Sequence, residues 1–239
     1  MSHKCCILQK WEDLPDFMRT PEVRPYYNNL DRKRWSLRLK KVFDISVAGI
    51  IICFFCIPMI LIGIAIKLDS SGPVFFRQER VTTYGKPFLI YKFRTMVFDI
   101  EKAGIGVTLQ EDPRITRLGK ILRKYRIDEV PQLINIIRGE MSFVGTRPEL
   151  PLFVRQYTPE MMATLLLPAG VTSKASIKYK DEATLFDKAV CAEEIYIKKV
   201  LPEKMKINLE AIKEFSLLGE LEIMGKTVWA VIGKVAENR

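Results

Sequence analysis

Two adjacent carboxylates, Asp128 and Glu129, lie in the part of the sequence that is best equipped for chemistry. Basic residues surround this pair in the sequence: Arg123, Lys124, Arg126, Arg138 and Arg147. A predicted strand upstream contributes two more, Lys92 and Arg94. A carboxylate that attacks a pyrophosphate approaches like charge, so such a site needs cationic side chains and a divalent cation. Guanidinium groups bind phosphate oxygens bidentately, and a lysine acts as a point charge. The pattern favours a phosphate site, for which the chain supplies every part except the metal.

Helix capping is the competing explanation for the same pair. Asp128 precedes an apolar helical repeat, and Pro131 stands where the first turn would be. Aspartate is a preferred N-cap, and glutamate is favoured in a first turn. Spacing alone favours the cap, whereas the surrounding cations favour the phosphate site.

Composition excludes several other kinds of site. The single histidine, His3, excludes histidine-based triads and histidine-rich zinc sites. Neither a Walker loop nor a G-x-G-x-x-G motif is present, which leaves phosphate binding to side chains and helix ends. The five cysteines have no framework spacing, so a reducing compartment is favoured. The net charge of +10 favours anionic partners, namely nucleic acid, anionic lipid or phosphorylated substrates.

An uncharged segment of bilayer length runs from Ile45 to Ile66. Its presence disfavours nucleic acid, and we expect no nucleic-acid partner. Pro58 lies past the middle of the segment, and a proline kinks a helix. Basic residues flank both ends, and such residues favour the cytoplasmic face of a membrane. A bent, re-entrant helix is therefore favoured over a spanning helix, and a buried core helix of a soluble protein is the third alternative.

The remaining elements are predicted from local patterns. Residues 1–35 carry three prolines and scattered charges, which indicate an extended N-terminal arm. Residues 73–81 and 86–96 flank a Thr-Thr-Tyr-Gly turn and predict a β-hairpin. A basic amphipathic helix is expected from Arg117 onward, suited either to an anionic membrane surface or to packing on a core. Further helices are expected at about 128–138, 185–200 and 203–236.

Beyond these patterns, the sequence from about residue 36 to 239 resembles the monotopic phosphoglycosyl transferases, also called the bacterial sugar transferase family. The motifs that carry the resemblance are KKVFD at 40–44, KLDSSGPVFFRQERV at 67–81, YKFRTM at 91–96 and DEVPQLINIIRGEMSFVGTRP at 128–148. A lone Asp-Glu pair is a weak signal, but this ordered series is highly specific.

The resemblance implies an α+β, mostly helical fold. It implies a re-entrant membrane helix-break-helix at 36–67 and a cytoplasmic catalytic domain at 68–239, with a small β-hairpin or sheet and interfacial amphipathic helices. The extended arm at 1–35 lies outside the resemblance, and its role is unknown. The resemblance further implies a monotopic protein of the bacterial cytoplasmic (inner) membrane, in contact with anionic membrane lipid. A homo-oligomer is left open.

The resemblance also implies a reaction. Asp128 would be the nucleophile that takes a sugar phosphate from a UDP-sugar, releasing UMP and leaving a covalent aspartyl intermediate. Polyprenyl (undecaprenyl) phosphate would then attack it, in the first membrane step of bacterial glycan assembly. Glu129 matches the partner carboxylate, and Mg2+ is the expected cofactor, with Asp128 as its protein ligand. Phosphate binding is assigned to Lys92, Arg94, Arg123 and Arg147.

Three departures from the family pattern stand out. Cys56-Ile57 replaces the Ser-Pro common at the bend, and the proline moves to Pro58. Thr146 stands before Arg147, where family members usually have a proline, and this change loosens a rigid turn. Residues 168–173 read Pro-Ala-Gly-Val-Thr-Ser where members often read Pro-Gly-Ile-Thr-Gly, and we expect the changed loop to affect carbohydrate specificity. These departures keep one rival open: a catalytically silent basic membrane adaptor for a glycan-assembly complex.

Overall fold

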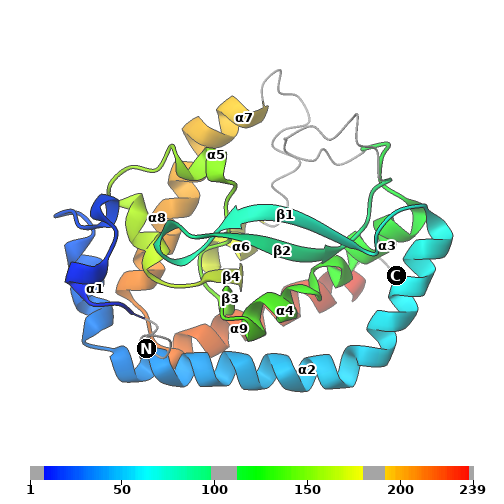
Figure 1. Ribbon diagram of the computed structural model, residues 1–239, viewed down its shortest axis with the longest axis horizontal. Helices are drawn as coiled ribbons and strands as arrows, with labels where there is room; N and C mark the ends of the chain where they lie inside the picture. Colours follow the sequence, from blue (N-terminus) through cyan, green and yellow to red (C-terminus); the bar gives the residue numbers. More distant parts are fainter. Residues whose placement is uncertain (1–7, 98–111, 180–191, 237–239) are drawn as a thin grey trace.

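The computed structural model describes residues 8–97, 112–179 and 192–236, and the side chains of the last helix as far as residue 230. Within these residues the fold is α+β and mostly helical, as predicted (Figure 1). Its sheets are both two-stranded: an antiparallel hairpin of β1 (Phe75–Val81) and β2 (Pro87–Phe93), and a parallel pair of β3 (Met141–Val144) and β4 (Ala169–Thr172). The predicted hairpin is confirmed, with Phe75 opposite Phe93 and Val81 opposite Pro87.

The helices that precede strand β3 differ in length. The long α2 spans Arg34–Asp69, and the short α1 (Arg24–Asp31) precedes it. The predicted basic helix is α3 (Arg117–Lys124), where Thr116 accepts a hydrogen bond from the Gly119 amide as N-cap. It is followed by a 3-10 turn, η4 (Ile127–Glu129), and by α4 (Gln132–Ile137). The helix expected at 128–138 is therefore split into a turn and a shorter helix.

Most of the remaining described helices lie in the second half of the chain. They are α5 (Pro151–Val154), α6 (Lys174–Lys178), α7 (Ala192–Ile195), a π-helical stretch Tyr196–Val200, α8 (Leu201–Lys213) and α9 (Leu217–Ala236). The single helix expected at 203–236 is wrong, because α8 and α9 separate around Glu214–Ser216. Of the helix expected at 185–200, residues 185–191 lie outside the described residues.

Helix α2 is continuous from Arg34 to Asp69, so the expected break is not a gap between two helices. Figure 1 shows instead that its second part turns away from the first, so that the helix runs along one side of the domain and then along its end. Pro58 lies inside the helix and donates no backbone hydrogen bond, which is the usual cause of such a bend. In the most apolar 18-residue window only 11% is buried, so α2 is not the core helix of a soluble domain.

The N-terminal segment is not the extended arm that its prolines predicted. Residues 11–13 and 16–18 form 3-10 turns, and α1 follows. The segment buries apolar side chains in the largest core cluster, among them Leu8, Leu14, Met18, Val23, Tyr26 and Leu30. Its apolar residues lack helical or strand periodicity because they are spaced by turns, so the pattern concealed a packed segment.

Two smaller core clusters join the domain to both parts of α2. Ala48 of α2 packs with Phe88 and Ile90 of the hairpin and with residues of α4, β3 and β4. Eighteen residues later, Ile66 packs with Phe93 of β2 and Leu122 of α3. The helix therefore contacts one and the same domain on either side of its exposed apolar middle.

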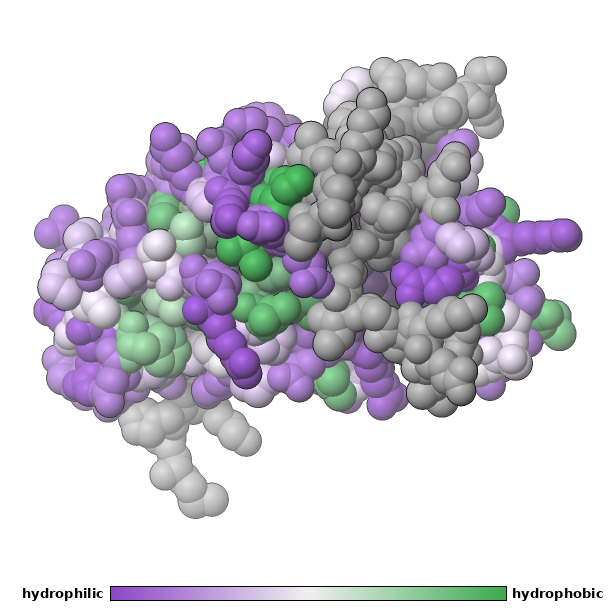
Figure 2. Space-filling view, turned by 90° about the horizontal axis from the view of Figure 1, so that it is seen from above, coloured by the Kyte–Doolittle hydropathy of each residue, from purple (hydrophilic) through white to green (hydrophobic). Residues whose placement is uncertain are grey.

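Figure 2, seen from the side away from the first part of α2, shows a face on which hydrophilic residues predominate.

Candidate active site

Asp128 and Glu129 lie in the turn η4, between α3 and α4. Arg126, just before this turn, adopts a left-handed conformation with φ of 55°, which is uncommon for a residue other than glycine. It reverses the chain after α3, so that the two carboxylates follow the basic helix directly and face β2. Such strained residues cluster at functional sites.

Glu129 is the centre of the cationic cluster. Its carboxylate is buried and accepts hydrogen bonds from Lys92 Nζ at 2.9 Å, Arg126 Nη2 at 2.7 Å and Arg147 Nη2 at 2.5 Å. Burial opposes ionisation of Glu129, but Arg147, Lys92 and Arg126 outweigh it and hold the pKa of the carboxyl well below its usual range. Glu129 is therefore a fixed anion that positions two predicted phosphate ligands, Lys92 and Arg147.

Asp128 has a different environment from its neighbour. It makes no hydrogen bond or ion pair with any residue in the described part of the chain, and burial together with the charge of Glu129 raises the pKa of its carboxyl. It does not cap a helix either, since neither η4 nor α4 has a side-chain N-cap. The helix-cap explanation is thus wrong, and the geometry leaves Asp128 as the carboxylate available for chemistry.

The other predicted phosphate ligands divide into two groups. Arg123 donates from Nε to Thr95 Oγ1 at 2.8 Å and lies close enough to Asp128 for electrostatic attraction. Arg94 does not join this cluster. It is buried and donates to the carbonyls of Ile66 and Ser70 at 3.1 and 2.6 Å, which ties it to the C-terminal end of α2. Strand alternation would place Lys92 and Arg94 on the same face, but β2 ends at Phe93, so Arg94 lies beyond the strand and its side chain is free to turn toward α2.

Arg126 is the residue that the sequence interpretation left out of the candidate ligands. It contacts Glu129 directly, and the signal was its spacing of three residues from that carboxylate in a turn. A second basic residue, Arg80 of β1, donates to the Pro148 carbonyl at 3.1 Å and so supports the segment that carries Arg147. Burial lowers the pKa of Arg80.

The donor set of this site suits a magnesium ion shared with a substrate. No cluster of three or more acidic, cysteine or histidine side chains occurs among residues 8–97, 112–179 and 192–236. Mg2+ is commonly bound by one or two carboxylates together with substrate phosphates and water. Asp128 offers one carboxylate that pairs with no cation of the described residues, whereas the oxygens of Glu129 are already engaged. The residues present therefore fit a Mg2+ held by Asp128 and by phosphate oxygens.

The segment at residues 168–173 proves to be more than a loop. Its central part is β4, whose Gly170 lies so close to Gly145 that a Cβ on Gly170 would be 2.2 Å from the Gly145 nitrogen. Arg147 Nη1 also lies 3.4 Å from the carbonyl of Val171 in this strand. The departure from the family pattern therefore falls in a buried strand beside the site.

Comparison with known proteins gives one family and several relatives. Residues 35–234 match the family described as bacterial sugar transferase. The chain is 34% identical over 197 residues to the UDP-N-acetylgalactosamine-undecaprenyl-phosphate N-acetylgalactosaminephosphotransferase of Aeromonas hydrophila, covering 81% of this chain and 44% of the relative.

Two relatives carry another donor sugar in their names. The UDP-glucose:undecaprenyl-phosphate glucose-1-phosphate transferase of Caulobacter vibrioides is 33% identical over 79% of this chain and 68% of its own length. The protein of the same description from Escherichia coli K12 is 34% identical over 80% of this chain and 39% of its own length. The chain thus spans less than half of the Aeromonas and Escherichia relatives.

Proposed function

Because this chain belongs to the bacterial sugar transferase family, we propose that it transfers a sugar 1-phosphate from a UDP-sugar to undecaprenyl phosphate. The named relatives are sugar-phosphate transferases that act on undecaprenyl phosphate, so the chain is an enzyme of the phosphoglycosyl transferase class. The observation that supports the proposal best is the contrast between Asp128, which has no partner among the described residues, and Glu129, which three cations hold.

The proposed reaction has two displacements at one phosphorus atom. A carboxylate oxygen of Asp128 attacks the phosphorus that bears the sugar, and the bond from this phosphorus to the bridging oxygen of UMP breaks, which releases UMP. A phosphate oxygen of undecaprenyl phosphate then attacks the same phosphorus, and the bond to Asp128 breaks. The product is the undecaprenyl diphosphate sugar, and Asp128 is regenerated. The covalent step divides one difficult displacement into two easier ones.

The basic residues neutralise charge on the phosphates. Arg147 and Lys92, which Glu129 orients, and Arg123 beside Asp128 would bind the phosphate oxygens of the donor. Bound Mg2+, held by Asp128 and the diphosphate, would add positive charge where negative charge develops. Glu129 is then a positioning residue rather than a nucleophile, because its oxygens are occupied.

We propose a monotopic arrangement for α2. A spanning helix carries its ends to opposite sides of a bilayer, but here one domain packs against Ala48 and against Ile66. Between them lie exposed side chains such as Phe54, Ile57 and Leu61, which suit the hydrocarbon core. A re-entrant helix that enters and leaves on the cytoplasmic face satisfies both observations. Anionic lipid would contact the basic helix α3, whose Ile121 is exposed.

Release of UMP tests the reaction. Membranes that contain the chain, incubated with a panel of UDP-sugars, undecaprenyl phosphate and Mg2+, should release UMP with one donor and form the undecaprenyl diphosphate sugar. Release of UDP would indicate simple glycosyl transfer and would refute the proposed chemistry. No release with any donor would favour the rival, a silent basic membrane adaptor. For the topology, labelling from outside the cell of a cysteine introduced at an exposed position in α1 would contradict the cytoplasmic placement.

A further inference from the structure

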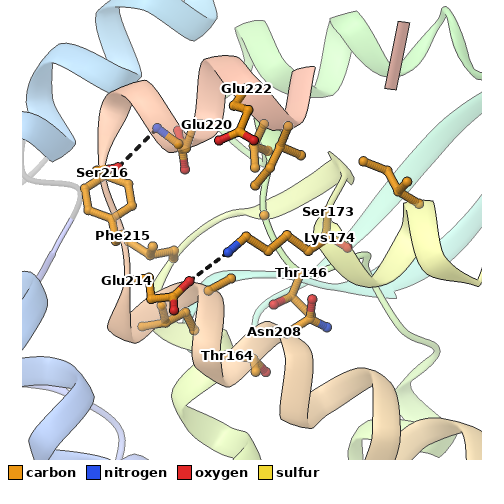
Figure 3. A pocket seen from close by; sticks show the side chains of 18 of the residues that line it. Thr146, Thr164, Ser173, Lys174, Asn208, Glu214, Phe215, Ser216, Glu220 and Glu222 are labelled. Carbon is orange, nitrogen blue, oxygen red and sulfur yellow. Dashed lines mark hydrogen bonds and ion pairs between the residues drawn. The ribbon is translucent and has the colours of Figure 1, made fainter. Parts of the chain in front are cut away.

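A cavity of about 530 Å³ lies between the end of β3 and the helices α6, α8 and α9. Its lining includes neither Asp128 nor any of the predicted phosphate ligands, so it is separate from the proposed catalytic site. Figure 3 shows side chains from these elements converging on one space. The volume lies in the range usual for small-molecule sites.

The polar groups of this cavity include an amide without a partner. Asn208 of α8 is 5% exposed, and its side chain makes no hydrogen bond with any described residue. Figure 3 shows it directed toward Thr146 and the side chain of Lys174. The amide atoms of Asn208 are not sealed from solvent, so they are open to the cavity, where the hydroxyl groups of a ligand would bond to them in place of water. The hydroxyl of Thr146, also without a hydrogen bond to a described residue, lies beside it.

The charges around the cavity are balanced and already paired. Three glutamates and three lysines line it. Each glutamate is bound to a lysine, at 2.6 or 2.7 Å: Glu214 to Lys174, Glu220 to Lys40 and Glu222 to Lys226. Among the lining lysines only the exposed Lys178, which lies over the Tyr179 ring, has no carboxylate partner in the described part of the chain. A phosphate or a nucleotide would thus find a single cation here, and a neutral ligand fits the balanced charges better.

The remaining wall is apolar. It includes Ile177, Ile212, Ile223 and the ring of Phe215, which is 5% exposed. A neutral ligand that meets an apolar wall on one side and an amide and a hydroxyl on another must have both kinds of surface. A sugar ring does, because its C–H groups form apolar faces and its hydroxyls both donate and accept hydrogen bonds.

We propose that this cavity binds a neutral saccharide of one or two rings, as a second site apart from the catalytic one. Two of the positions at which the chain departs from its family pattern, Thr146 and Ser173, line this cavity. Thr146 also precedes Arg147, which holds Glu129, so a bound saccharide has a short route to the catalytic pair.

Direct binding of free sugars tests the proposal. The full chain is reconstituted in lipid nanodiscs without glycoside detergents, since their headgroups are saccharides. Glucose, galactose, their 2-acetamido derivatives, maltose and lactose are then titrated, with binding followed by calorimetry or by saturation-transfer NMR. We expect one of them to bind, and excess UDP-sugar not to displace it. Displacement by UDP-sugar would place the saccharide in the catalytic site and refute a second one.

Matched variants locate the binding. Asn208→Leu and Thr146→Val should each raise the dissociation constant about tenfold, which is the effect of one lost hydrogen bond. Thr164→Val is the control, because Thr164 lines the same cavity but its hydroxyl already donates to the Met161 carbonyl at 2.7 Å. Unchanged binding in both test variants, or no saccharide bound by protein that releases UMP normally, would overturn the proposal. Loss of UMP release with saccharide binding retained would count against the proposed function alone.

Discussion

Replacing each member of the Asp128–Glu129 pair by its amide should separate catalysis from stability. Asp128→Asn removes a carboxylate whose pKa is raised by burial and by the neighbouring charge of Glu129, and which has no partner among the described residues. Its removal relieves both effects, so we expect the free energy of unfolding to stay equal or to rise by up to about 1 kcal/mol. Release of UMP should be abolished, because an amide cannot form the covalent intermediate.

Glu129→Gln, by contrast, should lower the free energy of unfolding. The pairs of Glu129 with Lys92 (23% exposed) and Arg147 (30% exposed) are partly shielded, and each such bond contributes about 1.5–3 kcal/mol. The pair with Arg126, which is 45% exposed, adds about 0.2–1 kcal/mol. Because the glutamine oxygen can keep one bond to Arg147, we expect a loss of about 3 kcal/mol. For a chain of this length, that lowers the melting temperature by about 6–12 °C.

The assay is thermal unfolding of both variants in the same lipid, together with release of UMP. Turnover of Glu129→Gln should fall at least about tenfold, because Lys92 and Arg147 lose their orientation. Glu194→Gln is the control: Glu194 pairs with Lys198 on the surface, both more than half exposed, and its loss should leave the melting temperature unchanged. Equal destabilisation by Asp128→Asn and Glu129→Gln, or turnover by Asp128→Asn, would refute the division of roles.

Three further predictions concern the frame of the site. Gly170→Ala should cost at least about 3 kcal/mol in denaturant unfolding, because its Cβ would meet backbone at 2.2 Å, whereas Gly225→Ala, with nothing within 4 Å, should be neutral or stabilising. Arg94→Met should lower the melting temperature more than it lowers turnover per folded molecule, since the guanidinium holds the end of α2; the reverse would show a role in catalysis. Burial raises the pKa of Glu220 above its ordinary value of 4.5, so the folded protein favours the protonated carboxyl. The stability that this protonation contributes is complete below pH 4.5 and is lost as the pH rises through the raised pKa. The stability of the parent chain relative to Glu220→Gln should therefore decline as the pH rises above about 4.5, and a constant difference in urea unfolding would contradict this.

Local pattern was enough for the elements that depend on nearby residues. The bilayer-length run of α2, the hairpin register around a turn with Tyr84 and Gly85 at positive φ, and the amphipathic α3 all follow from the order of side chains. The ordered motifs around Asp128 and Glu129 likewise identified the family. Each of these features is short in sequence, so propensity and periodicity carry the information.

Tertiary structure decided which residue does what. Asp128 and Glu129 are adjacent in one turn. Besides the nearby Arg126, Lys92 from β2 and Arg147 from beyond β3 make Glu129 a fixed anion, whereas Asp128 has no partner among the described residues. Arg94, two residues from Lys92, was drawn to the end of α2 instead. The N-terminal turns and the cavity at Asn208 were also invisible in the pattern, since both depend on contacts between segments that are far apart in the sequence. Long-range packing fixes such contacts, and no local spacing encodes them.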